Sequence, residues 1–440
     1  MHIVVVGAGV IGVTTAYCLL ARGHDVTLVD AADRVASGAS SVNAGLLCPA
    51  DSTVWATPQA PGMLLRALRD RETGFIRIKP AAFPELIPWG VRFLSQCSPR
   101  RMRRNMRFAY ALSDYSRREL TRLGGEVPLD FGRNEDGLFV LYPSESALEQ
   151  GWRDRAALAE VGVEYRRVGR DGLATVPGFT RAAAADVAGA IYASNSGYGD
   201  CQAFTRALTA RILNLGVELR LSCPVRRVHV RKGQAGGVDT ASGRITADTV
   251  LLAAGSMSAT LAATARVRVP VVPAKGYGVT VPILDDEAIP MVGCIDERHH
   301  VAVTRMGPHV RMSSHAEFTG QNHDWAPENF AAIHGFADAM FGPEALDWPK
   351  ANYGAGLRPL TPDGRPLIGP TALPGLWLNT GHGHLGWTQA CGSASLIADL
   401  LDKRPTAIDA RPYLPRRRHD ACGSLSVSNP EEGAGWHVSS

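Results

Sequence analysis

The sequence predicts an α/β protein, α+β overall, in which a parallel-sheet domain is interleaved along the chain with an antiparallel-sheet domain. Residues 1–30 pass from a β-branched run through a glycine turn and a helical stretch to a second β-rich run, which is a βαβ unit. Alternating apolar and polar segments between residues 267 and 317 predict an antiparallel sheet. A strand, a glycine turn and a helix close the fold at residues 376–400.

Composition and charge narrow the class of protein. The chain has 440 residues, of which 45% are hydrophobic and 20% charged, enough for two or three domains with large cores. The formal net charge of +4 is too small for a nucleic-acid binder. Eight cysteines without a CxxC pair predict reduced thiols and a cytoplasmic protein. No apolar run reaches the roughly 18 residues of a membrane span.

The other elements predict how these domains divide the chain. Residues 51–160 are rich in Pro, Trp and Arg and then helical, which predicts a separate helical insertion. The later elements are a helix at 201–215, strands at 217–221 and 249–254, a strand pair around 232–237 and a helix near 328–340. We expect a nucleotide-binding domain over 1–50, 187–260 and 355–415, a substrate or cap domain over 51–186 and 261–354, and a disordered tail over 416–440.

A dinucleotide fingerprint lies in the first βαβ unit. Gly7, Gly9 and Gly12 stand between a strand and a helix that opens with Val10 and Ile11, and Asp30 ends the next strand. The first glycine permits the turn, the second the approach of a pyrophosphate, and the third the packing of helix on strand, while the helix N-terminus favours the anion. Asp30 would accept hydrogen bonds from the ribose. The motif predicts a Rossmann-type site without separating FAD from NAD.

Two distant segments favour FAD. The apolar strand at 249–255 ends in Ala254 and Gly255, where a second backbone approach to the dinucleotide is expected. Residues 379–387 (NTGHGHLGW) form a glycine turn that opens a helix. A helix N-terminus aimed at the flavin pyrimidine edge would stabilise the charge of the reduced ring.

Five further motifs carry a family resemblance over residues 1–415. They are SSVNAGLLCP (40–49), GYGDCQAF (197–204), VPAKGYGV (272–279), GLRPLTPDGRPLIG (356–369) and LNTGHGHLGWTQACGSASLIADL (378–400). Together they resemble the FAD-dependent D-amino-acid dehydrogenase family within the glycine oxidase and D-amino-acid oxidase superfamily.

The resemblance implies the residues that bind FAD. The pyrophosphate and flavin would be lined by Ser40, Ser41, Asn43, Ala44, Gly45 and Leu46, and the adenine by the backbone of Val225. The isoalloxazine would be held by Gly381, His382, Gly383, Leu385, Gly386, Trp387 and Thr388. Val42 stands where relatives with covalent flavin carry a histidine, so noncovalent FAD is expected, with Cys48 the alternative attachment point.

Three residues are candidates for catalysis, and the resemblance implies the first of them. Arg358 of the GLRP motif would clamp the substrate carboxylate, since a guanidinium binds a carboxylate bidentately; the alternative is an ion pair with Asp363 that braces the loop. If Arg358 is a loop brace, Arg305 and Arg311 are the next candidates for binding the carboxylate. Tyr277 would donate to the same carboxylate, close the site, or be a core-facing strand tyrosine. His382 would accept the amine proton or be structural.

The implied reaction is oxidative deamination of a small amino acid, D by the resemblance, to the 2-oxo acid and ammonia by hydride transfer from Cα to flavin N5. Alternatives are oxidation of a secondary amine such as sarcosine, D-proline or hydroxyproline, and an FAD-binding subunit of a larger complex. The electron acceptor would be oxygen or a quinone of a membrane chain, and no metal is expected. The Arg100–Arg107 block would contact acidic lipid at the inner membrane face, contact a partner subunit, or be a solvated helix face.

Overall fold

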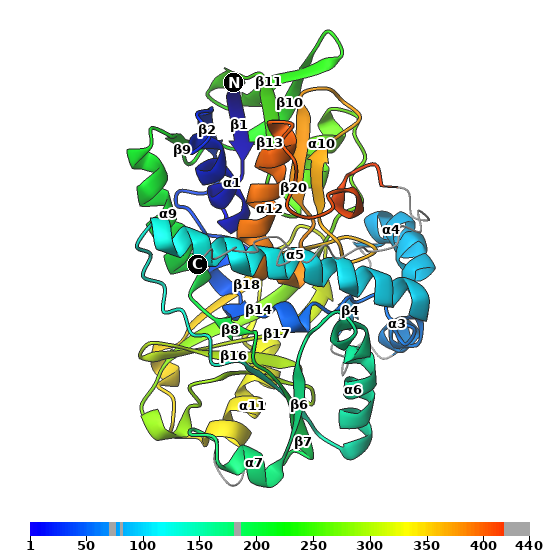
Figure 1. Cartoon of the computed structure of the whole chain (residues 1–440), viewed down its shortest axis with the longest axis vertical. Coiled ribbons are helices and arrows are strands. Elements are labelled where there is room, and N and C mark those ends of the chain that lie inside the picture. Colours follow the sequence, from blue (N-terminus) through cyan, green and yellow to red (C-terminus); the bar gives the residue numbers. More distant parts are fainter. Residues whose placement is uncertain (70–75, 80–81, 180–185, 418–440) are drawn as a thin grey trace, which may run out of the picture.

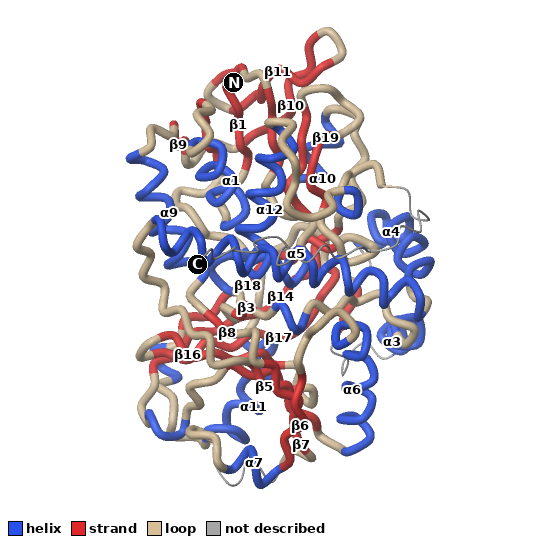
Figure 2. The backbone as a smooth tube through the Cα atoms, viewed as in Figure 1, coloured by secondary structure: helices blue, strands red, loops and turns tan. Residues whose placement is uncertain are grey.

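The computed structural model describes residues 1–69, 76–79, 82–179 and 186–417. Two sheets lie at opposite ends of the molecule, and the long helix α5 (Pro99–Glu126) crosses between them (Figure 1). The smaller sheet lies at the end of the molecule that holds the N-terminus, and helices pack around it (Figure 2). The larger sheet lies at the other end. The predicted mixture of a parallel and an antiparallel sheet is therefore present.

The six-stranded sheet is built from segments far apart in the sequence. Its order is β19-β20-β13-β1-β2-β9, parallel except at the β19 edge. The strands are β1 (His2–Val6), β2 (Asp25–Val29), β9 (Glu218–Arg220), β13 (Thr249–Leu252), β19 (Leu367–Pro370) and β20 (Leu376–Thr380). The small sheet β10 (Val225–Arg231), β11 (Gln234–Thr240) and β12 (Gly243–Thr246) adjoins it.

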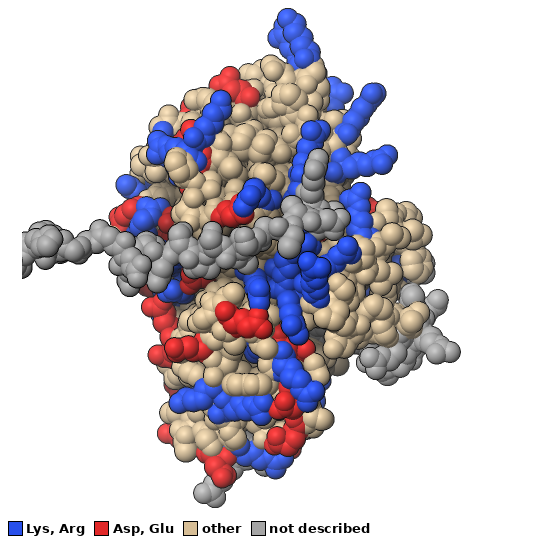
Figure 3. Space-filling view, turned by 45° about the vertical axis from the view of Figure 1, so that its right-hand side comes forward, with Lys and Arg blue, Asp and Glu red and all other residues tan. Residues whose placement is uncertain are grey.

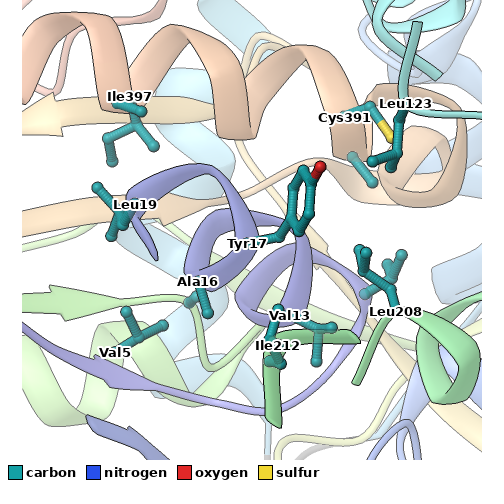
Figure 4. Packing of buried hydrophobic residues seen from close by; sticks show 14 of the residues in the cluster. Val5, Val13, Ala16, Tyr17, Leu19, Leu123, Leu208, Ile212, Cys391 and Ile397 are labelled. Carbon is teal, nitrogen blue, oxygen red and sulfur yellow. The ribbon is translucent and has the colours of Figure 1, made fainter. Parts of the chain in front are cut away.

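Two glycines set the turn from β1 into helix α1 (Val10–Leu20). Gly7 has φ +109°, and a Cβ there would lie 2.6 Å from the carbonyl oxygen of Ala253. A Cβ on Gly12 would lie 1.7 Å from the carbonyl oxygen of Gly7, so the helix contacts the turn directly. Figure 4 shows α1 packed among α9 (Cys201–Asn214), α5 and α12 (Gly386–Leu401), with residues Val13, Tyr17, Leu208, Leu123 and Cys391 in the cluster.

The nine-stranded sheet forms the other end of the molecule. Its order is β18-β14-β17-β16-β15-β5-β7-β6, with β4 paired to β17. The strands are β4 (Ile76–Ile78), β5 (Leu138–Tyr142), β6 (Tyr165–Gly169), β7 (Gly189–Ala193), β14 (Val272–Pro282), β15 (Gly293–Asp296), β16 (Val301–Met306), β17 (His309–Phe318) and β18 (Asn352–Leu360). One face packs on α11 (Ala331–Phe341) around Phe330 and Phe336.

The opposite face of this sheet has a floor of four glycines. Gly276 and Gly278 of β14 pair with Gly356 and Gly354 of β18. A Cβ on Gly354 or Gly356 would lie 2.6 Å from a methyl carbon of Val42, in the short helix α2 (Ala39–Val42). The glycines therefore let the chain that follows β2 lie directly on the second sheet.

Helices α3 (Ala60–Arg69), α4 (Phe83–Gln96), α5 and α6 (Glu145–Ala159) arise from the expected insertion. The insertion is not separate, because Leu112, Tyr115 and Leu123 of α5 share a buried core with α1, α9 and α12. Strand β7, expected with the nucleotide-binding domain, pairs with β5 and β6 in the larger sheet. The domain division therefore stays a proposal, with α5 and β7 packed across it.

The expected tail begins at Arg416, and most of it, residues 418–440, lies outside the described residues. Arg417 is bonded to the body of the protein, because its guanidinium donates to both carboxylate oxygens of Asp363 at 2.6 and 3.1 Å. Among the described helices, none is both long and apolar enough to cross a bilayer.

Gly12→Ala should destabilise the protein by about 3 kcal/mol or more, because the added carbon would overlap the Gly7 carbonyl and force α1 away from the sheet. Thermal unfolding of both proteins measures the difference. The matched control is Gly124→Ala in α5, where a Cβ meets nothing within 4 Å and Ala should stabilise the helix by roughly 0.5–1 kcal/mol. Equal melting temperatures for the two variants would show that the contact is relaxed without cost.

Candidate active site

The N-terminus of α1 forms a backbone cradle for an anion. Gly9 is the N-cap residue, and no acidic side chain stands in the first turn to neutralise the helix dipole. A Cβ on Gly9 would meet only the Ser40 hydroxyl, at 3.3 Å, and that hydroxyl accepts a hydrogen bond from Val10 N–H at 3.1 Å. Backbone without side chains thus faces this position, which fits a pyrophosphate.

Asp30 and the strand ends beside it complete the nucleotide side. The Asp30 carboxylate accepts hydrogen bonds from the backbone N–H of Ala8 at 2.6 Å and of Ala32 at 2.8 Å, which fixes it at the end of β2. The N–H of Cys223 donates to Asp30 O at 2.8 Å, so the chain entering β10 at Val225 runs beside it. Ala254 and Gly255 follow β13, where a Cβ on Gly7 would lie 2.8 Å from the Ala254 Cα.

The segment 39–46 is held by its own polar groups. Ser41 Oγ donates to Gly38 O, and Asn43 Nδ2 to Ala39 O, so both side chains close local turns. Thr304 of β16 donates to Ala44 O at 2.6 Å. Gly45 O accepts from Gly199 N–H at 2.9 Å, and Leu46 pairs with Tyr198 between β3 (Leu46–Leu47) and β8 (Gly197–Tyr198). The segment is thereby tied to the second sheet.

The glycine turn at 379–388 meets this segment. Gly381 and Gly383 have φ +83° and +58°, and the short helix η6 (Gly383–Leu385) leads into α12 at Gly386. Trp387 Nε1 donates to Gly199 O at 3.1 Å, and Thr388 Oγ1 to Leu46 O at 3.3 Å. The side chains of Trp387 and Thr388 thus join α12 to the segment expected to line the flavin.

Two histidines in this turn are neutral at physiological pH. His382 is 2% exposed, its Nε2 has no hydrogen-bond partner among the described residues, and burial lowers its pKa to about 3. Burial and the nearby charge of Arg358 lower the pKa of His384 to about 4. His384 is exposed and lines a small hollow together with Trp55 and Gly383. A buried unpartnered nitrogen in the turn fits a bound polar ring.

Arg358 lies on the glycine floor. It pairs with Ala274 across β14 and β18, and its guanidinium crosses Gly276, where a Cβ would lie 2.6 Å from the guanidinium carbon. Burial lowers its pKa to about 10, so it stays cationic at neutral pH. Asp363 already forms ion pairs with Arg365 and Arg417, which favours the carboxylate clamp over the loop brace as the role of Arg358.

Tyr277 is not brought to Arg358. It lies between Gly276 and Gly278 on β14, and alternate residues of a strand face opposite sides of the sheet. Its hydroxyl donates to Glu317 Oε2 at 2.6 Å, and its ring packs on Phe330 in the core beneath α11. This geometry favours the core-facing alternative over the role of a carboxylate donor.

The two alternative candidates for the carboxylate clamp, Arg305 and Arg311, form ion pairs with other residues. Arg305 pairs with Asp286. Arg311 donates to both carboxylate oxygens of Asp200 at 3.2 Å and to Thr280. The role of Arg358 as the clamp for a substrate carboxylate stays a prediction, which its place on the glycine floor favours.

Three aromatic side chains form a wall beside the turn that the sequence patterns did not predict. This aromatic wall consists of Trp55, Trp89 and Phe93, which line a small hollow of about 20 Å³ beside His382 and His384. The same three side chains line a cavity of about 750 Å³ between α3, α4, α5 and α6. The tryptophans of residues 51–89 were the available signal, but nothing in their spacing shows that they meet the distant glycine turn.

The chain is similar to known proteins over most of its length. The family model DAO, described as FAD dependent oxidoreductase, matches residues 2–400. The D-amino acid dehydrogenase of Cereibacter sphaeroides is 38% identical over 411 residues, covering 93% of this chain and 94% of that protein. The D-amino acid dehydrogenase of Sinorhizobium medicae is 36% identical and covers 93% and 98%.

Solved structures share the fold at low identity. Glycine oxidase from Geobacillus kaustophilus superposes with a TM-score of 0.72 at 21% identity, covering 94% of this chain and 98% of that one. L-proline dehydrogenase from P. horikoshii gives a TM-score of 0.70 at 17% identity, covering 94% and 96%. These likenesses confirm the predicted fold class.

Proposed function

The chain belongs to the DAO family of FAD-dependent oxidoreductases, and we propose that its substrate is a D-amino acid, oxidised to the 2-oxo acid and ammonia. The family resemblance and the FAD dependence predicted from the motifs are confirmed. The proposal of a D-amino acid is supported by relatives named D-amino acid dehydrogenase at 36–38% identity. The observation that carries it is Arg358 on the glycine floor, within electrostatic reach of His384 in the turn.

In this proposal the Gly9 cradle holds the FAD pyrophosphate, Asp30 the ribose, and the turn around His382 the flavin ring. When bound, FAD supplies the two-electron oxidation of the Cα–N bond, and water hydrolyses the resulting imine. Attachment is noncovalent, because Val42 has no nucleophile and its methyl groups pack on Gly354 and Gly356. The Cys48 alternative is disfavoured because burial raises the pKa of that thiol.

Arg358 orients the substrate. Its guanidinium is restrained above Gly276, so a bidentate carboxylate would be fixed relative to the turn. His382 and His384 are neutral, so they add no positive charge that would repel the amino group. Because its pKa is about 3, His382 is too weak a base to take a proton from the amine, so we propose the structural alternative for it, in which Nε2 forms a hydrogen bond with the bound polar ring.

We propose that the electron acceptor is reached at an anionic membrane surface on the cytoplasmic side. Exposed apolar side chains gather on α3 and α4. Leu65 lies outside the large cavity, whereas the other five also line its open side, namely Met63, Phe83, Ile87, Val91 and Leu94. Exposed Arg92, Arg100 and Arg103 follow on α4 and α5. Figure 3 shows basic side chains grouped beside a largely uncharged bulge in this region. Apolar residues flanked by arginines suit an acidic lipid surface.

The purified protein should be yellow, and acid precipitation should release its flavin as FAD.

Under anaerobic conditions D-amino acids should bleach the flavin. Their L-enantiomers should react about 100-fold more slowly, because misplacing the reacting carbon by about 1 Å lowers the rate by about that factor. Absorbance at 450 nm measures this, with sarcosine and D-proline as further substrates. Flavin that stays with the precipitate would contradict noncovalent binding. Faster bleaching by L-enantiomers or by secondary amines would show that those compounds, and not D-amino acids, are the substrates. No bleaching by any amine would indicate an FAD-binding subunit without turnover of its own.

The membrane proposal is tested by flotation with vesicles. The protein should float with vesicles that contain phosphatidylglycerol and should stay in solution with phosphatidylcholine alone, and binding should weaken as salt is raised. The variant Leu65→Asp should weaken binding, because Leu65 is exposed and does not line the large cavity. The control Leu213→Asp changes an exposed residue of α9, which lies away from α3 and α4, and should keep membrane binding. Equal binding of all three proteins would exclude the α3–α4 surface.

A further inference from the structure

We propose that the cavity between α3, α4, α5 and α6 receives the side chain of the substrate, and that the enzyme therefore prefers D-amino acids with a large apolar side chain. This inference rests on the proposed function. It adds a size and polarity selection by residues that the family resemblance does not assign.

The cavity adjoins the place where Arg358 would hold the carboxylate. Leu360 lies on the same face of β18, two residues beyond Arg358, and its carbonyl accepts a hydrogen bond from Trp89 Nε1 at 3.1 Å. Trp55 stacks on His384 with 6.0 Å between ring centroids, and His384 senses the charge of Arg358. The aromatic wall thus stands beside the carboxylate site.

The wall has the cavity on its other side. Trp55, Trp89 and Phe93 line both the hollow at His382 and His384 and the large cavity. Trp89 and Phe93 stack on each other at 4.9 Å. The cavity beyond these rings is the space into which the apolar side chain of a substrate held at Arg358 would extend.

The size of the cavity excludes a tight fit for alanine. Its volume of about 750 Å³ is that of a site for a whole small molecule. Its walls are mainly apolar and include Leu64, Leu86, Met102, Met106 and Phe318. Each methylene buried there should raise kcat/KM about fourfold.

The charges at one end of the cavity select against acidic side chains. Asp51, Asp154 and Glu297 line that end, and Arg155 is the one basic side chain among the described lining residues. Arg155 is already bonded to Asp51 at 2.9 Å and to the Tyr142 hydroxyl. Burial raises the pKa of Asp51 to about 6 even beside this arginine. A further carboxylate would enter a region with excess negative charge.

Two glycines provide a matched test. Gly90 of α4 lines the cavity, whereas Gly62 of α3 is exposed and does not, and a Cβ on either meets nothing within 4 Å. Gly90→Phe should fill the cavity, and Gly62→Phe should leave it unchanged. Ala147→Leu narrows it from α6 and replaces Gly90→Phe if that variant loses FAD or melts early.

The measurement is anaerobic stopped-flow reduction of the flavin by D-alanine, D-phenylalanine and D-glutamate. For the unaltered protein, kcat/KM should be at least about tenfold higher for D-phenylalanine than for D-alanine, and lowest for D-glutamate. Gly90→Phe should lower the value for D-phenylalanine about tenfold or more and leave D-alanine within about twofold, while Gly62→Phe changes neither.

Two results would overturn the inference. They are an unaltered protein that prefers D-alanine, and a cavity variant that slows both substrates equally. Reduction by D-alanine alone would still support the proposed function, so the two claims can fail separately. Reduction by none of the three would overturn both.

Discussion

The rest of the structure depends on one close contact, between the chain that follows β2 and the glycine floor of the second sheet. Four glycines, two on β14 and two on β18, carry no side chain where they face α2, so α2 lies directly on the strands and the guanidinium of Arg358 crosses Gly276. An added Cβ at Gly278, Gly354 or Gly356 would overlap Val42, and one at Gly276 would overlap the Arg358 guanidinium. The chain that follows β2 and includes α2 therefore connects the nucleotide cradle with the carboxylate site on the glycine floor.

That contact also orders the groups around the turn at 379–388. The helix α12 begins where its first side chains bond to Gly199 and Leu46, so the turn is fixed against the segment on the floor. His382 and His384 are kept neutral by burial, while Arg358 keeps its charge. The site thus offers one cation for a carboxylate and uncharged rings for the remainder of the substrate, and the aromatic wall directs its side chain.

Local patterns in the sequence predicted the elements whose causes are local. The run from Gly7 to Gly12 fixed the βαβ unit, and helix α9 at Cys201–Asn214 agrees with the expected 201–215. The position of α5 and the opposite facing of Tyr277 depend on tertiary packing and on the pleat, which single motifs do not encode. The glycines of GYG and YGAG were visible as alternate small residues, but their register across two strands was needed to recognise a floor.

The central claim is that Arg358 binds the substrate carboxylate, and its most direct test is the half-saturation concentration for anaerobic flavin reduction by a D-amino acid in Arg358→Lys. We expect that concentration to rise about 10- to 150-fold, because one charge-assisted hydrogen bond contributes about 1.5–3 kcal/mol, with FAD content unchanged. Arg305→Lys, whose parent arginine pairs with Asp286, serves as the control and should behave normally. Normal half-saturation and normal rate in Arg358→Lys would contradict the account.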